Sequence, residues 1–246
     1  MTSVRTMLFR AFTLVASAAL LAACGGPSLK PAPPLLAPYG QAQVWGVAPL
    51  RNESGTSLPD GLLIADAMQQ EIELVDGLAA APVNRVVGAM RGLGLTRIAS
   101  PAEASAIMSE LHLDALLVGS ITAYDPYRPM TLGLAFDLYV RGAGEGSGLD
   151  PEHLTRATSL PAAPGDLGRP GPASQASAVF AASDHHVVQW LEAFAAGRHE
   201  PGSALGTNVY MVSMDAYTKF ACHRLLGTLL HLEQQRVGAA QVAASH

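Results

Sequence analysis

The chain has 246 residues, and its 15 Lys and Arg side chains are outnumbered by 20 Asp and Glu side chains, which gives a net charge of −5 at pH 7. This acidic balance disfavours a nucleic-acid partner, because phosphate binding needs a basic surface. The length suits one substantial domain or two small ones.

The first 23 residues have the layout of a secretory signal peptide. Arg5 and Arg10 give a basic start, an apolar stretch follows, and the run Leu21-Ala22-Ala23 leads into Cys24. Only 13 residues separate Arg10 from Cys24, whereas a transmembrane helix needs about 20 apolar residues. The pattern therefore favours a cleaved leader over a membrane span, and plain secretory cleavage beside an incidental cysteine stays open as an alternative.

Leu21, Ala22, Ala23 and Cys24 resemble the lipobox of bacterial lipoproteins. The resemblance implies cleavage just before Cys24, which would remove residues 1–23, and a diacylglyceryl group on the Cys24 sulfur. Several acyl chains on one residue anchor a protein stably. Gly25 follows the cysteine in place of the aspartate that commonly retains lipoproteins at the inner membrane. By that resemblance we expect an outer-membrane protein, attached through its acyl anchor, with its body facing the periplasm.

Residues 24–42 are predicted to be a lipidated, proline-rich tether. The segment has no amphipathic period, and proline-rich linkers favour extended polyproline geometry. We expect it to hold the folded body away from the membrane. Its prolines are Pro27, Pro31, Pro33, Pro34 and Pro38.

The first half of the body alternates strand-like and helix-like patterns. An apolar strand is predicted at 44–50, followed by turn residues at 51–55, with Asn52 in the turn and Asp60 at the entry to the next helix. Helices are predicted at 62–75, from a cap at Asn84 through Met90, and from Ser100 to about 111, with a short strand at 78–83. Ser100-Pro101-Ala102-Glu103 has the capping-box pattern.

The second half begins with a predicted antiparallel strand pair. Residues 114–124 have the pattern of a buried strand, and Met130–Val140 alternates as a half-buried strand does. A flexible loop is expected at 142–173 and a return to the sheet at 178–181. Helices are then expected from Ser183 to Gly197 and over 209–237, before a disordered tail at 238–246. These elements predict a single α/β domain at 43–237, with helices on a sheet and a long C-terminal helix.

Two segments resemble a superfamily of periplasmic α/β proteins that includes the TolB amino-terminal domain, the secretion lipoprotein CsgG and the LpoB activators. They are Val44–Gly55 (VWGVAPLRNESG) and Leu113–Ile121 (LDALLVGSI). The resemblance implies a mixed β-sheet packed with helices in three layers. It also implies a cell-envelope setting and a role in interaction or assembly, because the members are mostly not enzymes.

The side chains suited to catalysis or metal binding do not converge in the sequence. His185 and His186 are adjacent and point apart on a helix, and His223 and His231 are two helical turns apart. We therefore interpret the histidines, with His199, as surface residues near helix ends. Cys222 is expected in the core, and Tyr124, Tyr127 and Tyr139 are expected to pack rather than to form an aromatic patch.

The sequence thus predicts a non-enzymatic outer-membrane lipoprotein whose periplasmic domain binds another envelope protein. No cofactor, metal or nucleic acid is expected beyond the covalent lipid on Cys24. One alternative is a CsgG-like secretion channel, a homo-oligomer whose wall is built from hairpins like the one containing Met130–Val140. The other is a periplasmic hydrolase or metal-binding protein, because a Ser-His-Asp arrangement is recognised by geometry and no sequence pattern excludes it.

Overall fold

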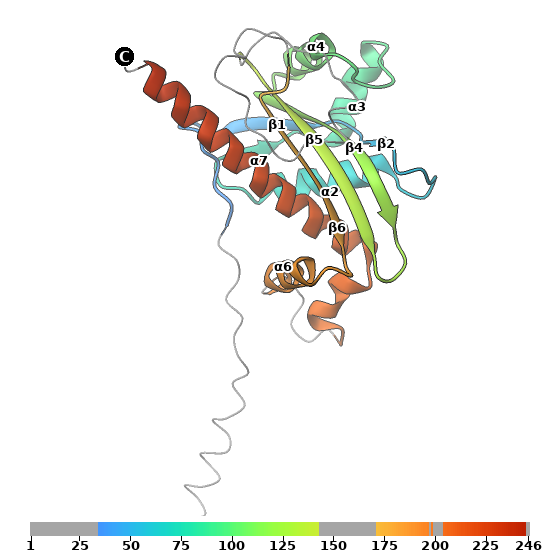
Figure 1. Ribbon diagram of the computed structural model, residues 1–246. Coiled ribbons are helices and arrows are strands. Elements are labelled where there is room, and N and C mark those ends of the chain that lie inside the picture. Colours follow the sequence, from blue (N-terminus) through green and yellow to red (C-terminus); the bar gives the residue numbers. More distant parts are fainter. Residues whose placement is uncertain (1–33, 143–170, 197, 199–203, 245–246) are drawn as a thin grey trace, which may run out of the picture.

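The computed structural model describes residues 34–142, 171–196, 198 and 204–244. Six strands in these ranges form one mixed sheet in the order β3-β1-β4-β5-β6, with β2 also paired to β4. β1 (Gln43–Val47), β2 (Arg51–Asn52) and β3 (Leu78–Ala80) make parallel pairs, and β4 (Ala115–Asp125), β5 (Thr131–Val140) and β6 (Ser174–Ala181) are successively antiparallel. The predicted mixed α/β sheet is confirmed (Figure 1).

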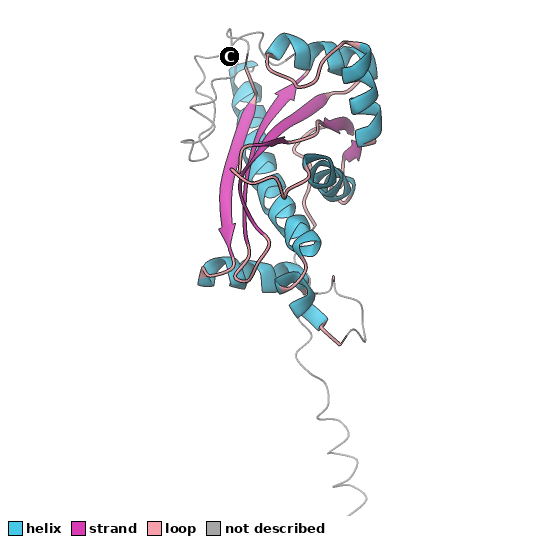
Figure 2. Cartoon of the chain, turned by 90° about the vertical axis from the view of Figure 1, so that its right-hand side faces the viewer, coloured by secondary structure: helices cyan, strands magenta, loops and turns pink. Residues whose placement is uncertain are grey.

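Helices cover both faces of this sheet, as the predicted three layers require. The helices α2 (Gly61–Glu73) and α7 (Met214–Ala244) contribute to a large core cluster on one face, together with α6 (His185–Ala195) and the 3₁₀ turn Gly206–Met211. The helices α3 (Val83–Gly92) and α4 (Pro101–Leu111) form a second, smaller cluster on the other face. Figures 1 and 2 show α3 and α4 near one end of the sheet and α6 near the other. The two faces are called the α2/α7 face and the α3/α4 face below.

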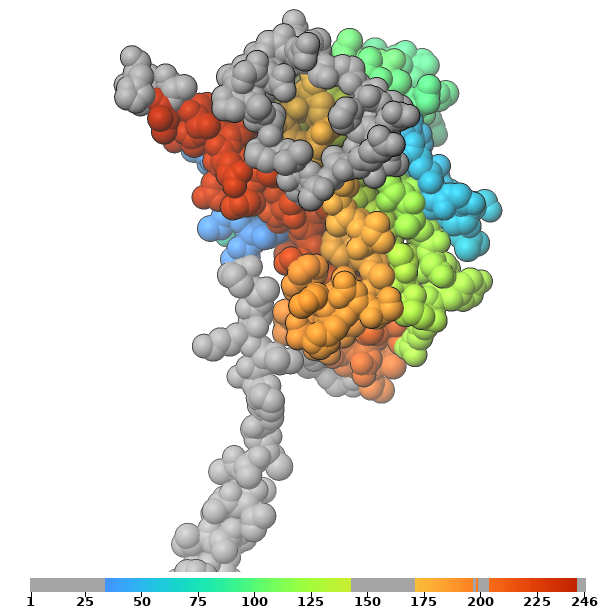
Figure 3. Space-filling model, in the orientation of Figure 1, coloured from blue at the N-terminus to red at the C-terminus, as the bar shows by residue number. Residues whose placement is uncertain are grey.

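The α2/α7 face is a continuous apolar core. Successive inward residues of β5 on this face, from Leu132 to Leu138, are fully buried, and α7 contributes Phe220, whose ring lies 5.5 Å from that of Phe180 on β6. Cys222 is buried and free, as predicted, and burial raises the pKa of its thiol. Figure 3 shows β6 and α6, in orange, at the surface between α7 and the β4–β5 hairpin.

β5 differs from the half-buried strand predicted from its alternation, because eight of its ten residues are buried. The face predicted to be exposed carries Gly133, Ala135, Asp137 and Tyr139, of which Ala135, Asp137 and Tyr139 are 1 to 3% exposed. These residues belong to the α3/α4 face, and β5 lies in the middle of the sheet between β4 and β6. A central strand between two helical layers is buried on both sides whatever its pattern.

The helix starts follow the local sequence closely. The Asp60 carboxylate accepts a hydrogen bond from the Leu62 N–H, and Ser100 and Glu103 form the predicted capping box of α4. The predicted cap at Asn84 is wrong, since α3 begins at Val83 with Pro82 as its capping residue. Val83 is 2% exposed, so its burial outweighs the missing side-chain cap.

The ends of the predicted domain also change. α7 continues to Ala244, past the expected end at 237, so residues 238–244 of the predicted tail are helical. At the other end, residues 35–39 of the predicted tether form a strap that packs on the core through Leu35, Ala37 and Tyr39. The strap is held by backbone hydrogen bonds between Ala37 N–H and Asp76 C=O and between Asp76 N–H and Leu35 C=O. Most of the predicted loop at 142–173 lies outside the described residues.

Candidate functional site

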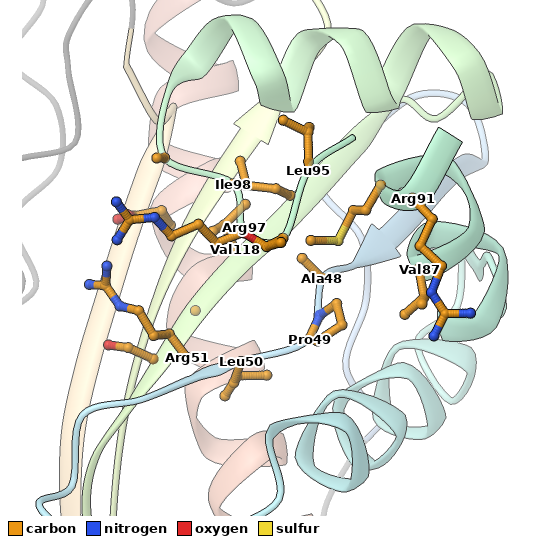
Figure 4. A pocket seen from close by; sticks show the side chains of 16 residues that line it. Ala48, Pro49, Leu50, Arg51, Val87, Arg91, Leu95, Arg97, Ile98 and Val118 are labelled. Carbon is orange, nitrogen blue, oxygen red and sulfur yellow. The ribbon is translucent and has the colours of Figure 1, made fainter. Parts of the chain in front are cut away.

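A cavity of about 620 Å³ opens on the α3/α4 face of the sheet. Its floor is formed by Val118, Gly119 and Ser120 of β4 and by Asp137 of β5. One wall is the β1–β2 connection at 48–50 with Arg51 of β2, and the other is the α3–α4 connection at 95–99 with the side of α3 (Figure 4). We call this cavity the α3/α4 pocket.

Local sequence fixes the second wall. α3 ends at Gly92 with Leu93 as its C-cap, and Gly94 follows with a φ of +68°, a conformation that suits glycine. The Leu95 N–H then bonds back to the Met90 carbonyl, and the capping box at Ser100 starts α4. Between the end of α3 and the start of α4, Arg97 and Ile98 line the pocket.

Asp137 is the buried acid of the pocket floor. Its side chain is 1% exposed, and its Oδ1 accepts a hydrogen bond from the Gln175 side-chain amide at 2.8 Å. Burial raises the pKa of Asp137 to about 6, and the bond from Gln175 offsets part of this effect. Neither Arg51 nor Arg97 forms an ion pair with this carboxylate in the described part of the chain. An uncompensated buried acid weakens the fold at neutral pH, and such groups are concentrated at functional sites.

Two hydroxyl groups near Asp137 also lack partners. Ser120 pairs with Ala135 across the β4–β5 ladder, so its side chain lies diagonally next to that of Asp137 on the same face. The hydroxyl oxygens of Ser120 and Tyr139 are buried and make no hydrogen bond. Leaving a buried polar atom unpaired costs about 1–3 kcal/mol. The fold itself uses neither hydroxyl, and Ser120 is one of the residues that line the pocket.

Three arginines surround the mouth of the pocket. Figure 4 shows the guanidinium groups of Arg51 and Arg97 on the same side of the cavity and that of Arg91 on the opposite side. Arg51 pairs with Glu53 through one terminal nitrogen, while its Nε is buried without a partner. Arg91 and Arg97 are exposed and have no acidic partner among the residues that the structure describes. The mouth is thus basic on a chain whose net charge is −5.

The pocket combines donors at its mouth with acceptors at its floor. Guanidinium groups only donate hydrogen bonds, whereas a carboxylate accepts them and a hydroxyl does both. Leu50, Met90 and Ile98 add apolar surface between these two polar zones. This arrangement suits binding of a ligand with an anionic group, an apolar body and N–H or O–H donors.

A second cavity, of about 660 Å³, lies beside a buried ion-pair cluster between α2 and α7. Both carboxylate oxygens of Glu71 accept from Arg198 at 3.0 Å, and Oε2 also lies 3.0 Å from Nδ1 of His223. The Arg198 guanidinium stacks 4.2 Å from the centre of the Phe194 ring. The interpretation of His223 as a surface residue is wrong: its side chain is only 14% exposed. Because every charge here has a partner, we assign this cluster to fold stability.

Glu233 of α7 organises the N-terminal strap in a similar way. The Tyr39 hydroxyl donates to Glu233 Oε2 at 2.8 Å, the Ser174 hydroxyl donates to Oε1 at 2.5 Å, and Arg236 forms a bidentate pair with both oxygens. Burial and the neighbouring Glu233 carboxylate raise the pKa of Tyr39. These bonds fasten residues 35–39 to α7 and β6.

The predicted anchor residues Leu21, Ala22, Ala23 and Cys24 lie outside the described residues, so the lipid anchor stays a prediction. Among the described residues, no helix has the length and hydropathy to cross a bilayer. In the same part of the chain no three His, Cys, Asp or Glu side chains are grouped as a metal site would require.

The three tyrosines do not form a patch: Tyr139 is buried, while Tyr127 is 74% exposed.

The pocket residues were not identified from the sequence. Asp137 was interpreted as part of the exposed side of a half-buried strand, and Arg51 as a turn residue. The available signal was a single carboxylate in the middle of an apolar strand, TLGLAFDLYV. No local pattern links it with Ser120, Arg91 and Arg97, because strand pairing and the α3–α4 connection bring them together.

Several solved protein structures are similar to this fold, although their sequence identities to the chain are low. No family model matches the chain, and no curated protein matches it. The LpoB C-terminal domain from Salmonella enterica is 12% identical, with 56% of this chain and 82% of that chain covered and a TM-score of 0.36. A lipoprotein from Neisseria meningitidis is 16% identical (56% and 81% covered, TM-score 0.36). PelC from Paraburkholderia phytofirmans, solved as a dodecamer, is 10% identical (82% and 94% covered, TM-score 0.35). LpoB, one of the resemblances noted in the sequence, thus recurs among the structural neighbours, and identities this low transfer neither a partner nor an activity.

Proposed function

We propose that the chain is a non-enzymatic outer-membrane lipoprotein whose periplasmic α/β domain binds another protein of the cell envelope through the α3/α4 pocket. The lipobox-like run Leu21–Cys24 supports the anchor and the compartment. The observation that carries the binding role is the pocket itself, with its basic mouth and the unpaired polar groups of its floor.

The argument for binding is energetic. Asp137 and the Ser120 hydroxyl are buried at a cost to the fold, whereas the buried carboxylates of Glu71 and Glu233 are paired with arginines. Proteins retain local features that weaken the fold mainly where function needs them. A partner that supplied hydrogen-bond donors to the floor would recover that cost on binding.

Site-specific photo-crosslinking in cells tests the proposal. The photoreactive residue p-benzoylphenylalanine is placed at position 96, at the pocket mouth beside Arg97, and at position 74, just after the end of α2 on the other face of the sheet. Both Thr96 and Leu74 are exposed, so neither replacement disturbs the core, and all three arginines of the mouth are kept. We expect one discrete adduct with an envelope protein from position 96 and none from position 74. Equal adducts from both positions, or none from 96, would overturn the proposed binding face.

The anchor is tested separately. Replacing Cys24 with serine removes the sulfur that the lipid requires and leaves residues 34–244 unchanged. We expect the variant in the soluble fraction with an unaltered circular-dichroism spectrum after purification. A Cys24→Ser variant that stays in the outer-membrane fraction would contradict acyl anchoring.

A further inference from the structure

We infer that the α3/α4 pocket recognises a short peptide segment in which an acidic residue is flanked by aliphatic ones. This inference rests on the proposed binding function and names the chemistry of the segment. The acidic side chain would lie between Arg51 and Arg97, an aliphatic neighbour would lie against the apolar wall, and backbone N–H groups would face the floor at Asp137.

The first argument is charge. Arg97 has no acidic partner among the described residues, and Figure 4 shows its guanidinium on the same side of the cavity as that of Arg51. Two guanidinium groups on one side of a pocket favour a carboxylate or a phosphate, which both accept paired hydrogen bonds. The chain as a whole has a net charge of −5 and therefore repels anions. The local positive charge at the pocket mouth would attract an anion to this one place.

The second argument separates a carboxylate-bearing peptide from a phosphate. A phosphate group brings chiefly acceptors, and at the floor it would meet the Asp137 carboxylate, which also only accepts. Asp137 needs donors, and backbone N–H groups of a peptide supply them while the acidic side chain supplies the acceptor for the arginines. A ligand that fits the pocket therefore carries both hydrogen-bond donors for Asp137 and an anionic acceptor for the arginines.

The third argument is size. Small-ligand pockets have volumes of about 300–1,000 Å³, and the α3/α4 pocket has about 620 Å³. The space suits a few residues of an extended or looped segment, and it is too small for a folded element. Leu50, Leu95 and Ile98 provide the apolar surface for the aliphatic neighbours.

Calorimetric titration of the full, detergent-solubilised chain tests this inference with three probes: N-acetyl-Leu-Asp-Leu-amide, its Leu-Asn-Leu counterpart and inorganic phosphate. We expect the acidic tripeptide to bind about tenfold more tightly than the neutral one, since their single difference is the carboxylate. Inorganic phosphate should compete weakly. Raising the salt concentration should weaken the acidic tripeptide more than the neutral one.

Two matched variants locate the site. Arg97→Gln and Arg85→Gln each remove one exposed arginine, but Arg85 of α3 does not line the pocket. We expect Arg97→Gln to weaken binding of the acidic tripeptide by about five- to tenfold and to leave the neutral one unchanged. Arg85→Gln should change neither by more than about twofold.

The outcomes separate this inference from the proposed function. Equal affinity for the two tripeptides, equal effects of the two variants, or phosphate binding as tightly as the acidic tripeptide would each overturn it. If no tripeptide binds while the adduct from position 96 persists, the peptide chemistry is wrong and the binding face stands. If the adduct is also absent, both are wrong.

Discussion

The buried carboxylates on the two faces of the sheet differ in whether an arginine binds them. On the α2/α7 face Glu71 and Glu233 are 3% and 0% exposed, and each is bound by an arginine with two hydrogen bonds or more. On the α3/α4 face Asp137 is equally buried but receives one amide bond from Gln175. The difference shows that the fold pairs the buried carboxylates of α2 and α7 with arginines, and that it does not do so for Asp137 at the pocket.

A matched contrast exists for hydroxyl groups. The buried Ser174 hydroxyl donates to Glu233, whereas the buried Ser120 hydroxyl has no partner. Tyr217 on α7 is an exception on the well-paired face, since its hydroxyl is also unpaired. The difference between the two faces therefore holds for the buried carboxylates and for the serines next to them, and it does not extend to every buried hydroxyl. The α2/α7 face pairs its buried carboxylates with arginines, and the α3/α4 face leaves Asp137 without a charged partner.

The largest expected effect comes from the packed face. Phe220→Ala removes a fully buried ring that contacts the rings of Phe180, Phe194 and Tyr217. Such a truncation costs about 3–5 kcal/mol of the free energy of unfolding. Urea denaturation followed by circular dichroism measures it. A loss below about 1 kcal/mol would mean that the α2/α7 face is not the main source of stability.

The second effect is a gain in stability at the pocket. Asp137 has a pKa of about 6 in the fold against an ordinary value of 3.8, which corresponds to about 3 kcal/mol. Asn has nearly the same shape, carries no charge and can still accept from Gln175. We expect Asp137→Asn to raise the free energy of unfolding at pH 7.5 by about 2–3 kcal/mol.

The pH dependence of this gain follows from its sign. The folded chain binds the Asp137 proton more tightly than the unfolded chain, so the destabilisation is absent below about pH 4, grows toward pH 6 and is complete above it. The gain from Asp137→Asn should follow the same profile in thermal melts. Glu110→Gln, at an exposed residue of α4, is the control and should show a change within about 0.5 kcal/mol. A gain that is independent of pH would show that Asp137 is not a buried charge.

Much of the fold was predictable because the signals are local. The capping box at Ser100, the apolar strand 114–124 and the alternation of Met130–Val140 each predicted the correct element. Which face of β5 is covered depends on α3 and α4, so its burial was not predictable from alternation alone. The strap was missed because Tyr39 and Glu233 are 194 residues apart in the chain. The pocket was missed for the same reason, since its arginines resemble solvated loop residues until the sheet is assembled.

The third effect tests the paired serine. Ser174→Ala removes a hydroxyl that donates to a buried carboxylate at 2.5 Å. Hydrogen bonds to charged groups contribute about 1.5–3 kcal/mol, and Tyr39 and Arg236 remain to compensate Glu233. We therefore expect a loss of about 2 kcal/mol in urea denaturation. An unchanged midpoint would show that Glu233 does not depend on this bond.

The smallest effect on stability is expected at the serine without a partner. Ser120→Ala removes a buried hydroxyl that makes no bond in the fold, so no hydrogen bond is lost and the desolvation cost of the group is released. The free energy of unfolding should stay within about 1 kcal/mol of the original value, on the side of a gain. Ser174→Ala is its matched control, since both are serine-to-alanine changes at buried strand positions. A loss at Ser120 as large as that at Ser174 would remove the distinction between the two faces, because it would mean that the fold itself uses the Ser120 hydroxyl.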